Sequence, residues 1–209
     1  MTFALNEIEA MAKGAARGAG FDWGIAEETG KSVRWLAARG LPGPELLIKT
    51  LKRSESITYS VAAPNITREL WMAPGGWLCP SFAGAAILDC AQSIAAGHKI
   101  QLGNIYFPLL LVPYAAMCGK NNSCIIEVSW PGATFTIATG GGLFIVGDEW
   151  ETAAVEWVRC CRIDKVPTGQ PIRETSRCSV PGPIFDNLNE YTQRTYAPAT
   201  EESRERGAG

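Results

Sequence analysis

Three side chains in one stretch of the sequence could carry acid–base or nucleophilic chemistry. Cys79 follows a turn of proline and glycine, Asp89 lies in the apolar run after it, and His98 comes a little later. A carboxylate inside an apolar helix is costly unless it is paired or protonated, and such an environment shifts its pKa toward catalytic use. A cysteine at a helix N-terminus can be an activated thiolate because of the helix dipole. One hypothesis is therefore a lyase, isomerase or hydrolase with Asp89 as acid or base, Cys79 as nucleophile and His98 in support.

Each of the three side chains also has a structural interpretation, which we take as the default. Asp89 would anchor backbone amides or an arginine, and Cys79 would be an inert buried thiol. His98 follows an apolar helix, where a polar side chain can cap the last turn. It is the single histidine of the chain, so a Ser-His-Asp or Cys-His mechanism would have to use it, and a site with several histidines is excluded.

Two further residues are candidates for ligand binding. Trp77 lies in the segment WMAPGGWLCPSFAGAAILDC, which combines two tryptophans, glycines, a cysteine beside a proline and an acid, and is the most site-like part of the sequence. Gly141 lies in a run of three glycines whose backbone amides could face a phosphate. Residues 143–146 after that run look like a strand, whereas a phosphate-binding loop needs a following helix. A hairpin turn is therefore the default interpretation of the glycine run.

The sequence indicates no metal or cofactor and gives little support for nucleic acid as a partner. No Cys-x-x-Cys pair occurs, and Cys118 and Cys124 are too loosely spaced for structural zinc. The formal net charge of -2 gives no broad attraction to phosphate backbones. The two N-terminal helices resemble a helix-turn-helix superficially, but their basic residues are matched by acidic ones. A DNA-binding regulator acting through this hairpin is for that reason only our third hypothesis.

The periodicity of apolar residues and the turn signals predict an α+β fold. We expect helices at 5–17, 23–38, 45–51, 81–96 and 184–196, a strand at 57–62, a loop with a short strand at 70–80, and strands at 105–115, 123–130, 134–138, 143–146 and 154–163. Short connections between the later strands favour antiparallel pairing. The expected architecture is an N-terminal helical hairpin plus a buried helix, 81–96, packed on a mainly antiparallel sheet. Residues 1–197 would form one domain, and 198–209 a mobile polar tail.

Composition indicates a folded cytoplasmic protein. Apolar residues make up 46% of the chain and charged residues 19%, close to ordinary globular values. The most apolar run, 105–117, is broken by Pro108 and Pro113 and is shorter than the roughly 20 residues that a membrane-spanning helix needs. Acidic residues near the N-terminus argue against a secretory signal, and the odd number of cysteines fits reduced thiols. We therefore expect no membrane association.

The segments FALNEIEAMAKGAARGAGFDWGIAEETGKSVRWLAARGLPG, LCPSFAGAAILD and RTYAPATEESRERGAG resemble a family of uncharacterised bacterial proteins of similar size, mainly from alphaproteobacteria and known as a domain of unknown function. The resemblance spans most of the chain and implies a bacterial cytosolic origin. This family has no activity that could be transferred to any residue here.

Our first functional hypothesis is an accessory or enzyme-associated subunit in bacterial small-molecule metabolism. No complete catalytic constellation is identifiable, and the seven tryptophans and apolar strands suggest a surface that a second copy or a partner subunit could cover. A small-molecule ligand is compatible with this hypothesis. The small-molecule enzyme described above is the alternative.

Overall fold

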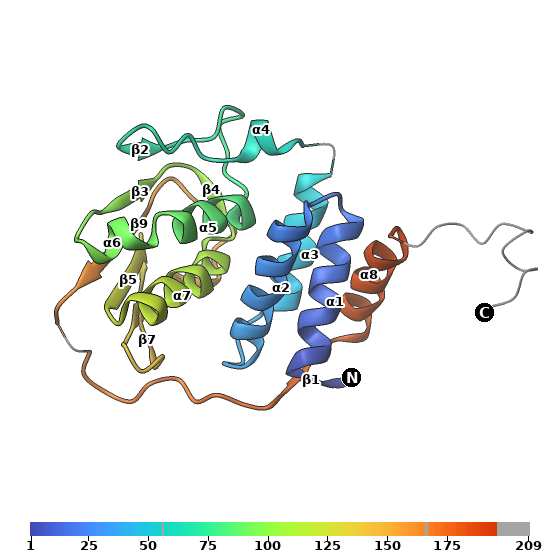
Figure 1. The fold of residues 1–209 in the computed structure, drawn as a ribbon. Helices are drawn as coiled ribbons and strands as arrows, with labels where there is room; N and C mark the ends of the chain where they lie inside the picture. Colours follow the sequence, from blue (N-terminus) through green and yellow to red (C-terminus); the bar gives the residue numbers. More distant parts are fainter. Residues whose placement is uncertain (56, 166, 196–209) are drawn as a thin grey trace, which may run out of the picture.

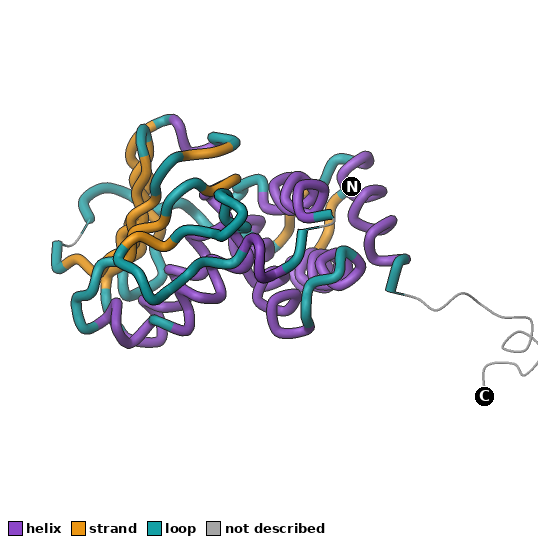
Figure 2. The backbone as a smooth tube through the Cα atoms, turned by 90° about the horizontal axis from the view of Figure 1, so that it is seen from above, coloured by secondary structure: helices purple, strands orange, loops and turns teal. Residues whose placement is uncertain are grey.

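The fold has three layers, which Figure 1 shows from one side and Figure 2 from above. The computed structural model describes residues 1–55, 57–165 and 167–195. A sheet forms one side of the molecule, a group of four helices forms the other, and α5 and α7 lie between them, where both contact α2. The predicted α+β class is confirmed. The predicted mobile tail, 198–209, lies outside the described residues.

The helical layer consists of α1 (Leu5–Gly18), α2 (Trp23–Ala37), α3 (Gly43–Ser54) and α8 (Gly182–Gln193). The apolar residues of α1 recur at helical spacing and are buried, so α1 packs against both α2 and α8. The predicted N-terminal helical hairpin is confirmed. Pro44 stands in the first turn of α3, where a missing N–H costs nothing, and this helix is longer than predicted at both ends.

The main sheet has six strands in the order β2–β3–β9–β5–β6–β7, and all its pairs are antiparallel except β2–β3. Its strands are β2 (Leu70–Trp71), β3 (Ile100–Leu102), β5 (Ile125–Trp130), β6 (Ala133–Ile137), β7 (Leu143–Gly147) and β9 (Val158–Ile163). Two short antiparallel pairs lie outside it: β1 (Thr2–Ala4) with β10 (Arg177–Ser179), and β4 (Ile105–Tyr106) with β8 (Ala154–Val155). The predicted antiparallel meander is present as β5, β6 and β7.

Two predicted strands are wrong. Residues 57–62 contain a short helix, α4 (Tyr59–Ala62), whose carbonyls at Val61 and Ala62 accept backbone bonds from Gly75 and Cys79 and not from a neighbouring strand. Most of 105–115 is also helical: after β4 come the 3₁₀ helix η1 (Pro108–Leu111) and α7 (Val112–Asn122). Pro108 and Pro113 both stand in first helical turns, where proline is well tolerated, whereas neither could donate to a sheet ladder.

The predicted buried helix 81–96 is two helices, α5 (Pro80–Asp89) and α6 (Ala91–Ala95). Most of α5 is buried, and it approaches α7 so closely that a Cβ at Gly84 would lie 2.3 Å from the Tyr114 ring. Asp89 is exposed at the end of α5, so the expectation of a buried carboxylate is wrong. The chain turns at Cys90, which leaves the Asp89 side chain in solvent instead of the core.

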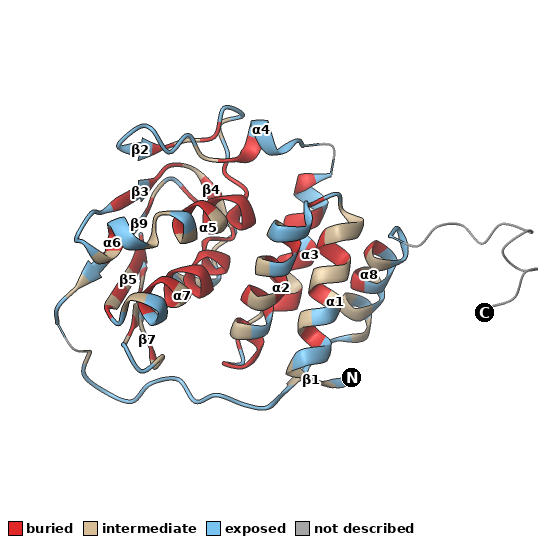
Figure 3. Cartoon of the chain, in the orientation of Figure 1, coloured by how far each residue is buried: buried red, intermediate tan, exposed pale blue. Residues whose placement is uncertain are grey.

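The core lies between the layers, along α5, α7 and the inner faces of α2 and α3, as Figure 3 shows. The predicted strand 154–163 is interrupted between β8 and β9, and a 3₁₀ helix, η2 (Glu149–Glu151), precedes β8. Residues 168–177 are exposed and run along the molecule from the sheet side to β10 (Figure 3). Among the helices of the described ranges, none is long and apolar enough to cross a membrane.

Candidate functional site

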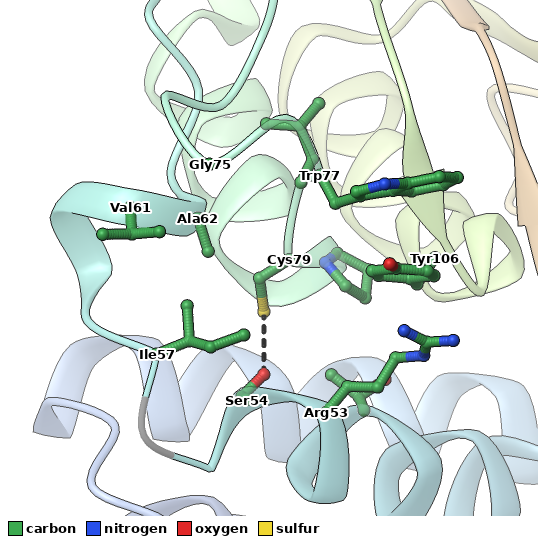
Figure 4. A pocket seen from close by; sticks show the side chains of 12 residues that line it. Arg53, Ser54, Ile57, Val61, Ala62, Gly75, Trp77, Cys79 and Tyr106 are labelled. Carbon is green, nitrogen blue, oxygen red and sulfur yellow. Dashed lines mark hydrogen bonds between the residues drawn. The ribbon is translucent and has the colours of Figure 1, made fainter.

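A pocket of about 170 Å³ lies where the C-terminal end of α3 meets α4 and the segment leading into α5. Figure 4 shows its side chains. Its lining is mostly apolar or aromatic: Thr50, Arg53, Ser54, Ile57, Val61, Ala62, Gly75, Trp77, Leu78, Cys79, Pro80 and Tyr106. Two residues predicted from the sequence as site candidates, Trp77 and Cys79, are therefore brought together here.

Local backbone geometry shapes one wall of this pocket. Gly75 donates a backbone hydrogen bond to Val61 at 2.8 Å, and a Cβ at Gly75 would lie 2.6 Å from the Val61 side chain. Only glycine permits this contact between the turn and α4. Cys79 in turn donates from its backbone to Ala62 at 3.0 Å. The turn predicted at residues 74–76 thus holds α4 against the start of α5.

The opposite wall is a stack of three side chains, which is the most distinctive feature of the pocket. The Trp77 and Tyr106 rings lie 4.3 Å apart and are nearly parallel, at 13°. On the other face of Tyr106 lies the Arg53 guanidinium, 3.7 Å from the ring centroid (Figure 4). A cation over an aromatic face is attracted by the negative face of the ring. The stack therefore orients Arg53 while its N–H groups stay open to solvent.

Arg53 is the charged side chain of this pocket. Within the described ranges, its side chain forms no ion pair with an acidic residue and no hydrogen bond. A planar guanidinium presents N–H groups that match a carboxylate in pairs. The site is thus suited to hold an anionic group next to an apolar cavity.

Cys79 lies on the floor of the pocket at the N-terminal end of α5 and is buried. Its sulfur accepts a hydrogen bond from the Ser54 hydroxyl at 3.8 Å (Figure 4). Burial raises the pKa of Cys79, and the backbone N–H of Phe82 and the Ser54 hydroxyl oppose this only in part. A raised pKa fits the inert buried thiol, which is the default interpretation, and gives no support to an activated thiolate, which needs a lowered pKa.

The structure does not bring Asp89 or His98 to Cys79. Asp89 lies at the other end of α5, about 15 Å along the helix at 1.5 Å per residue. His98 is exposed beyond α6, with its Nδ1 3.1 Å from the Ser93 carbonyl oxygen. That contact is the helix-capping arrangement which the sequence suggested as the structural role of His98. The three residues do not form one constellation.

Gly141 lies in the turn between β6 and β7 and has a positive φ of 85°. Its backbone N–H donates to Ala138 at 2.8 Å, so the hairpin interpretation of the glycine run holds. Gly141 does not line the pocket at Arg53, but it lines a second hollow, described below.

The N-terminal hairpin carries paired charges. Arg34 contacts Glu9 at 2.8 Å, and Lys31 contacts Glu27 at 3.0 Å. Within the described part of the chain, no group of three His, Cys, Asp or Glu side chains could hold a metal ion.

Arg53 and Tyr106 are the residues that sequence reasoning missed. Arg53 follows the predicted helix 45–51, in a run with Lys52 that reads as an ordinary solvated helix end. Tyr106 was assigned to a long strand. The sequence shows only that Trp77 and Tyr106 lie near turns. Their stacking depends on the bridge between Leu78 and Ile105, which local patterns do not predict.

The comparisons with known proteins give a fold likeness and a family-model match to the N-terminal part of the chain. A search of the curated proteins finds no match. Among solved structures, the chain is similar to a malate dehydrogenase from Entamoeba histolytica, with a TM-score of 0.52 and 10% sequence identity. The similarity covers 70% of this chain and 49% of that one, so this chain spans about half of the enzyme's length, and at this identity the likeness concerns the fold alone. Residues 3–76, from β1 to the turn before Trp77, match the model of the family described as Protein of unknown function (DUF3726).

Proposed function

We propose that this chain is a non-catalytic accessory subunit that binds a small apolar carboxylate in the pocket at Arg53. The observation that carries the proposal is the Trp77–Tyr106–Arg53 stack beside an apolar cavity. An arginine that is fixed on an aromatic ring, and has no acidic partner among the described residues, offers an anionic ligand its hydrogen bonds without competition.

The size of the cavity limits the ligand. Apolar cavities of about 150 Å³ hold one benzene ring. The cavity at Cys79 has about 170 Å³, so it fits a single ring or a short branched chain. Ile57 and Val61 supply apolar contacts on the side facing Cys79, and Arg53 lies at the edge, where a carboxylate can remain partly hydrated. An aryl or short-chain carboxylate meets both conditions.

Two features support an accessory role. The pocket contains a buried thiol whose pKa is raised by burial, and neither Asp89 nor His98 lines it. Exposed apolar side chains are also concentrated in residues 57–77, the segment that supplies much of the pocket lining. They are Ile57, Tyr59, Val61, Ile66, Leu70 and Trp77. Such a concentration favours contact with another subunit.

Calorimetric titration with benzoate and hexanoate, each beside its neutral amide, tests the ligand class. The carboxylates should bind and the amides should bind at least about tenfold more weakly, because a charge-assisted hydrogen bond contributes roughly 1.5–3 kcal/mol. Arg53→Gln should remove this difference. Lys52→Gln is the matched control, since Lys52 is an exposed neighbour on the same helix that does not line the pocket.

Equal affinity for acids and amides, or an unchanged preference in Arg53→Gln, would refute the ligand class. The accessory role has its own test. A purified chain that stays monomeric and turns over a metabolite unaided would instead support the small-molecule enzyme.

A further inference from the structure

A second hollow lies between the helical layer and the sheet side, and it differs in chemistry from the pocket at Arg53. It is an open groove of about 660 Å³. Its lining comes from α1, α2, α7, the β6–β7 turn and the exposed segment after β9: Leu5, Glu9, Lys31, Arg34, Trp35, Ala38, Arg39, Ala116, Met117, Lys120, Thr139, Gly140, Gly141 and Glu174. Four cations line it: Lys31 and Arg34 pair with glutamates of α1 and α2, Arg39 pairs with Glu174, and Lys120 forms no ion pair within the described ranges. Arg39 and Lys120 are therefore the groups of the groove that could receive an added anion.

Arg39 is the buried centre of this groove. Its side chain is only 5% exposed and stacks on the Trp35 ring at 3.7 Å. The guanidinium donates to the Trp35 carbonyl at 3.1 Å and to the Gly141 carbonyl at 3.2 Å. Its Nε is buried and has no hydrogen-bond partner among the described residues. A buried donor without a partner is costly, which points to a group that this groove is built to receive.

The carboxylate of Glu174 lies beside the Arg39 guanidinium, where an anionic ligand would bind. Glu174 forms an ion pair with Arg39 from a segment that is otherwise exposed, and the Glu174 side chain is 62% exposed. Backbone bonds from Ile172 to Leu143 at 2.8 Å and from Thr175 to Ala38 at 2.7 Å hold the same segment. Among the described residues, the bonds that hold 167–176 across the groove are therefore these two, a bond from the Thr175 hydroxyl to Ala38 and the Glu174–Arg39 pair.

We propose that the groove binds an oxyanion, a phosphate or a carboxylate group, and that Glu174 occupies the same guanidinium in the free protein, so that the ligand displaces it and releases residues 167–176. A ligand with two charges gains contacts that Glu174 cannot make. Lys120 lines the groove, and within the described ranges it forms no ion pair. Because the Glu174 side chain is 62% exposed, water can hydrate its carboxylate when a ligand displaces it from Arg39.

Titration with inorganic phosphate at constant ionic strength, with chloride as the reference ion, tests the site. Phosphate should bind saturably and chloride should not. Lys120→Gln should weaken phosphate binding about fivefold, whereas Glu174→Gln should strengthen it about tenfold because the competing charge is gone. Lys49→Gln and Glu69→Gln are the matched controls, because both residues are exposed and line neither hollow. The titrations are repeated in an Arg53→Gln background, where the effects of Lys120→Gln and Glu174→Gln should persist, because neither residue lines the pocket at Arg53.

Hydrogen exchange tests the release of the segment. Saturating phosphate should speed exchange at the backbone amides of Ile172 and Thr175, both of which are hydrogen-bonded in the free protein. A parallel titration with malonate shows whether phosphate or carboxylate is the preferred source of the oxyanion. Phosphate and malonate binding no tighter than chloride, or binding that ignores both Lys120→Gln and Glu174→Gln, would overturn the site. Binding with no change at the two amides would overturn the displacement of Glu174.

Discussion

Two arginines on neighbouring helices face two hollows, and they are held in opposite ways. Arg39 at the end of α2 is buried, paired with Glu174 and bonded to two carbonyl groups. Arg53 at the end of α3 is exposed and stacks on Tyr106, and its side chain has no ion pair among the described residues. Both use an aromatic face, at the same distance of 3.7 Å. The two arginines differ in their acidic partner. A ligand that binds Arg39 must displace Glu174, whereas a ligand that binds Arg53 displaces no acidic side chain of the described residues.

Replacing each arginine by methionine gives the largest expected contrast. Arg39→Met should lower the free energy of unfolding by about 2–3 kcal/mol, because hydrogen bonds from a buried charged group are lost. Arg53→Met should change it by less than about 0.5 kcal/mol, as is usual for exposed positions. Urea unfolding measures both values. Equal effects of the two substitutions would contradict the idea that Arg39 stabilises the fold whereas Arg53 is available to a ligand.

Adding one methyl group at Gly75 should weaken ligand binding in the pocket at Arg53 and leave binding in the groove at Arg39 unchanged. Gly75→Ala should cost about 1–3 kcal/mol, since the new Cβ would lie 2.6 Å from Val61 and push α4 away. Carboxylate binding should weaken, while phosphate binding in the groove stays the same. Gly24→Ala is the matched control, because a Cβ there meets nothing within 4 Å. Calorimetry of both ligands would show whether the two hollows are independent; a parallel loss at both would contradict this.

The protonation of Cys79 predicts a pH dependence. Burial raises the pKa of this thiol above its usual value of 9.0. Below pH 9 its contribution to stability is fully present; above it the unfolded chain releases the proton first, so stability falls as pH rises toward the folded pKa. For one thiol the slope reaches about 1.4 kcal/mol per pH unit. Cys79→Ala should therefore lose stability less steeply than the parent protein in reducing urea titrations above pH 9. Identical slopes would mean that the pocket tolerates a thiolate.

The helical hairpin and the meander could be predicted because their signals are local. Apolar residues at helical spacing defined α1 and α2, and glycine and proline turns marked the limits of β5, β6 and β7. The failures also had local causes. Residues 57–62 have strand propensity, and Pro108 and Pro113 lie in an apolar run whose period does not distinguish a buried strand from a buried helix.

By itself, the sequence determined the α+β class, the lone histidine and a site-like segment around Trp77 and Cys79. The tertiary structure decided which polar groups meet. It left Asp89 and His98 in solvent, buried Cys79 and so raised its pKa, and brought Arg53 to Tyr106 and Arg39 to Glu174. The physical reason is that side-chain chemistry at a site depends on burial and on partners from distant segments, and neither follows from the spacing of residues along the chain.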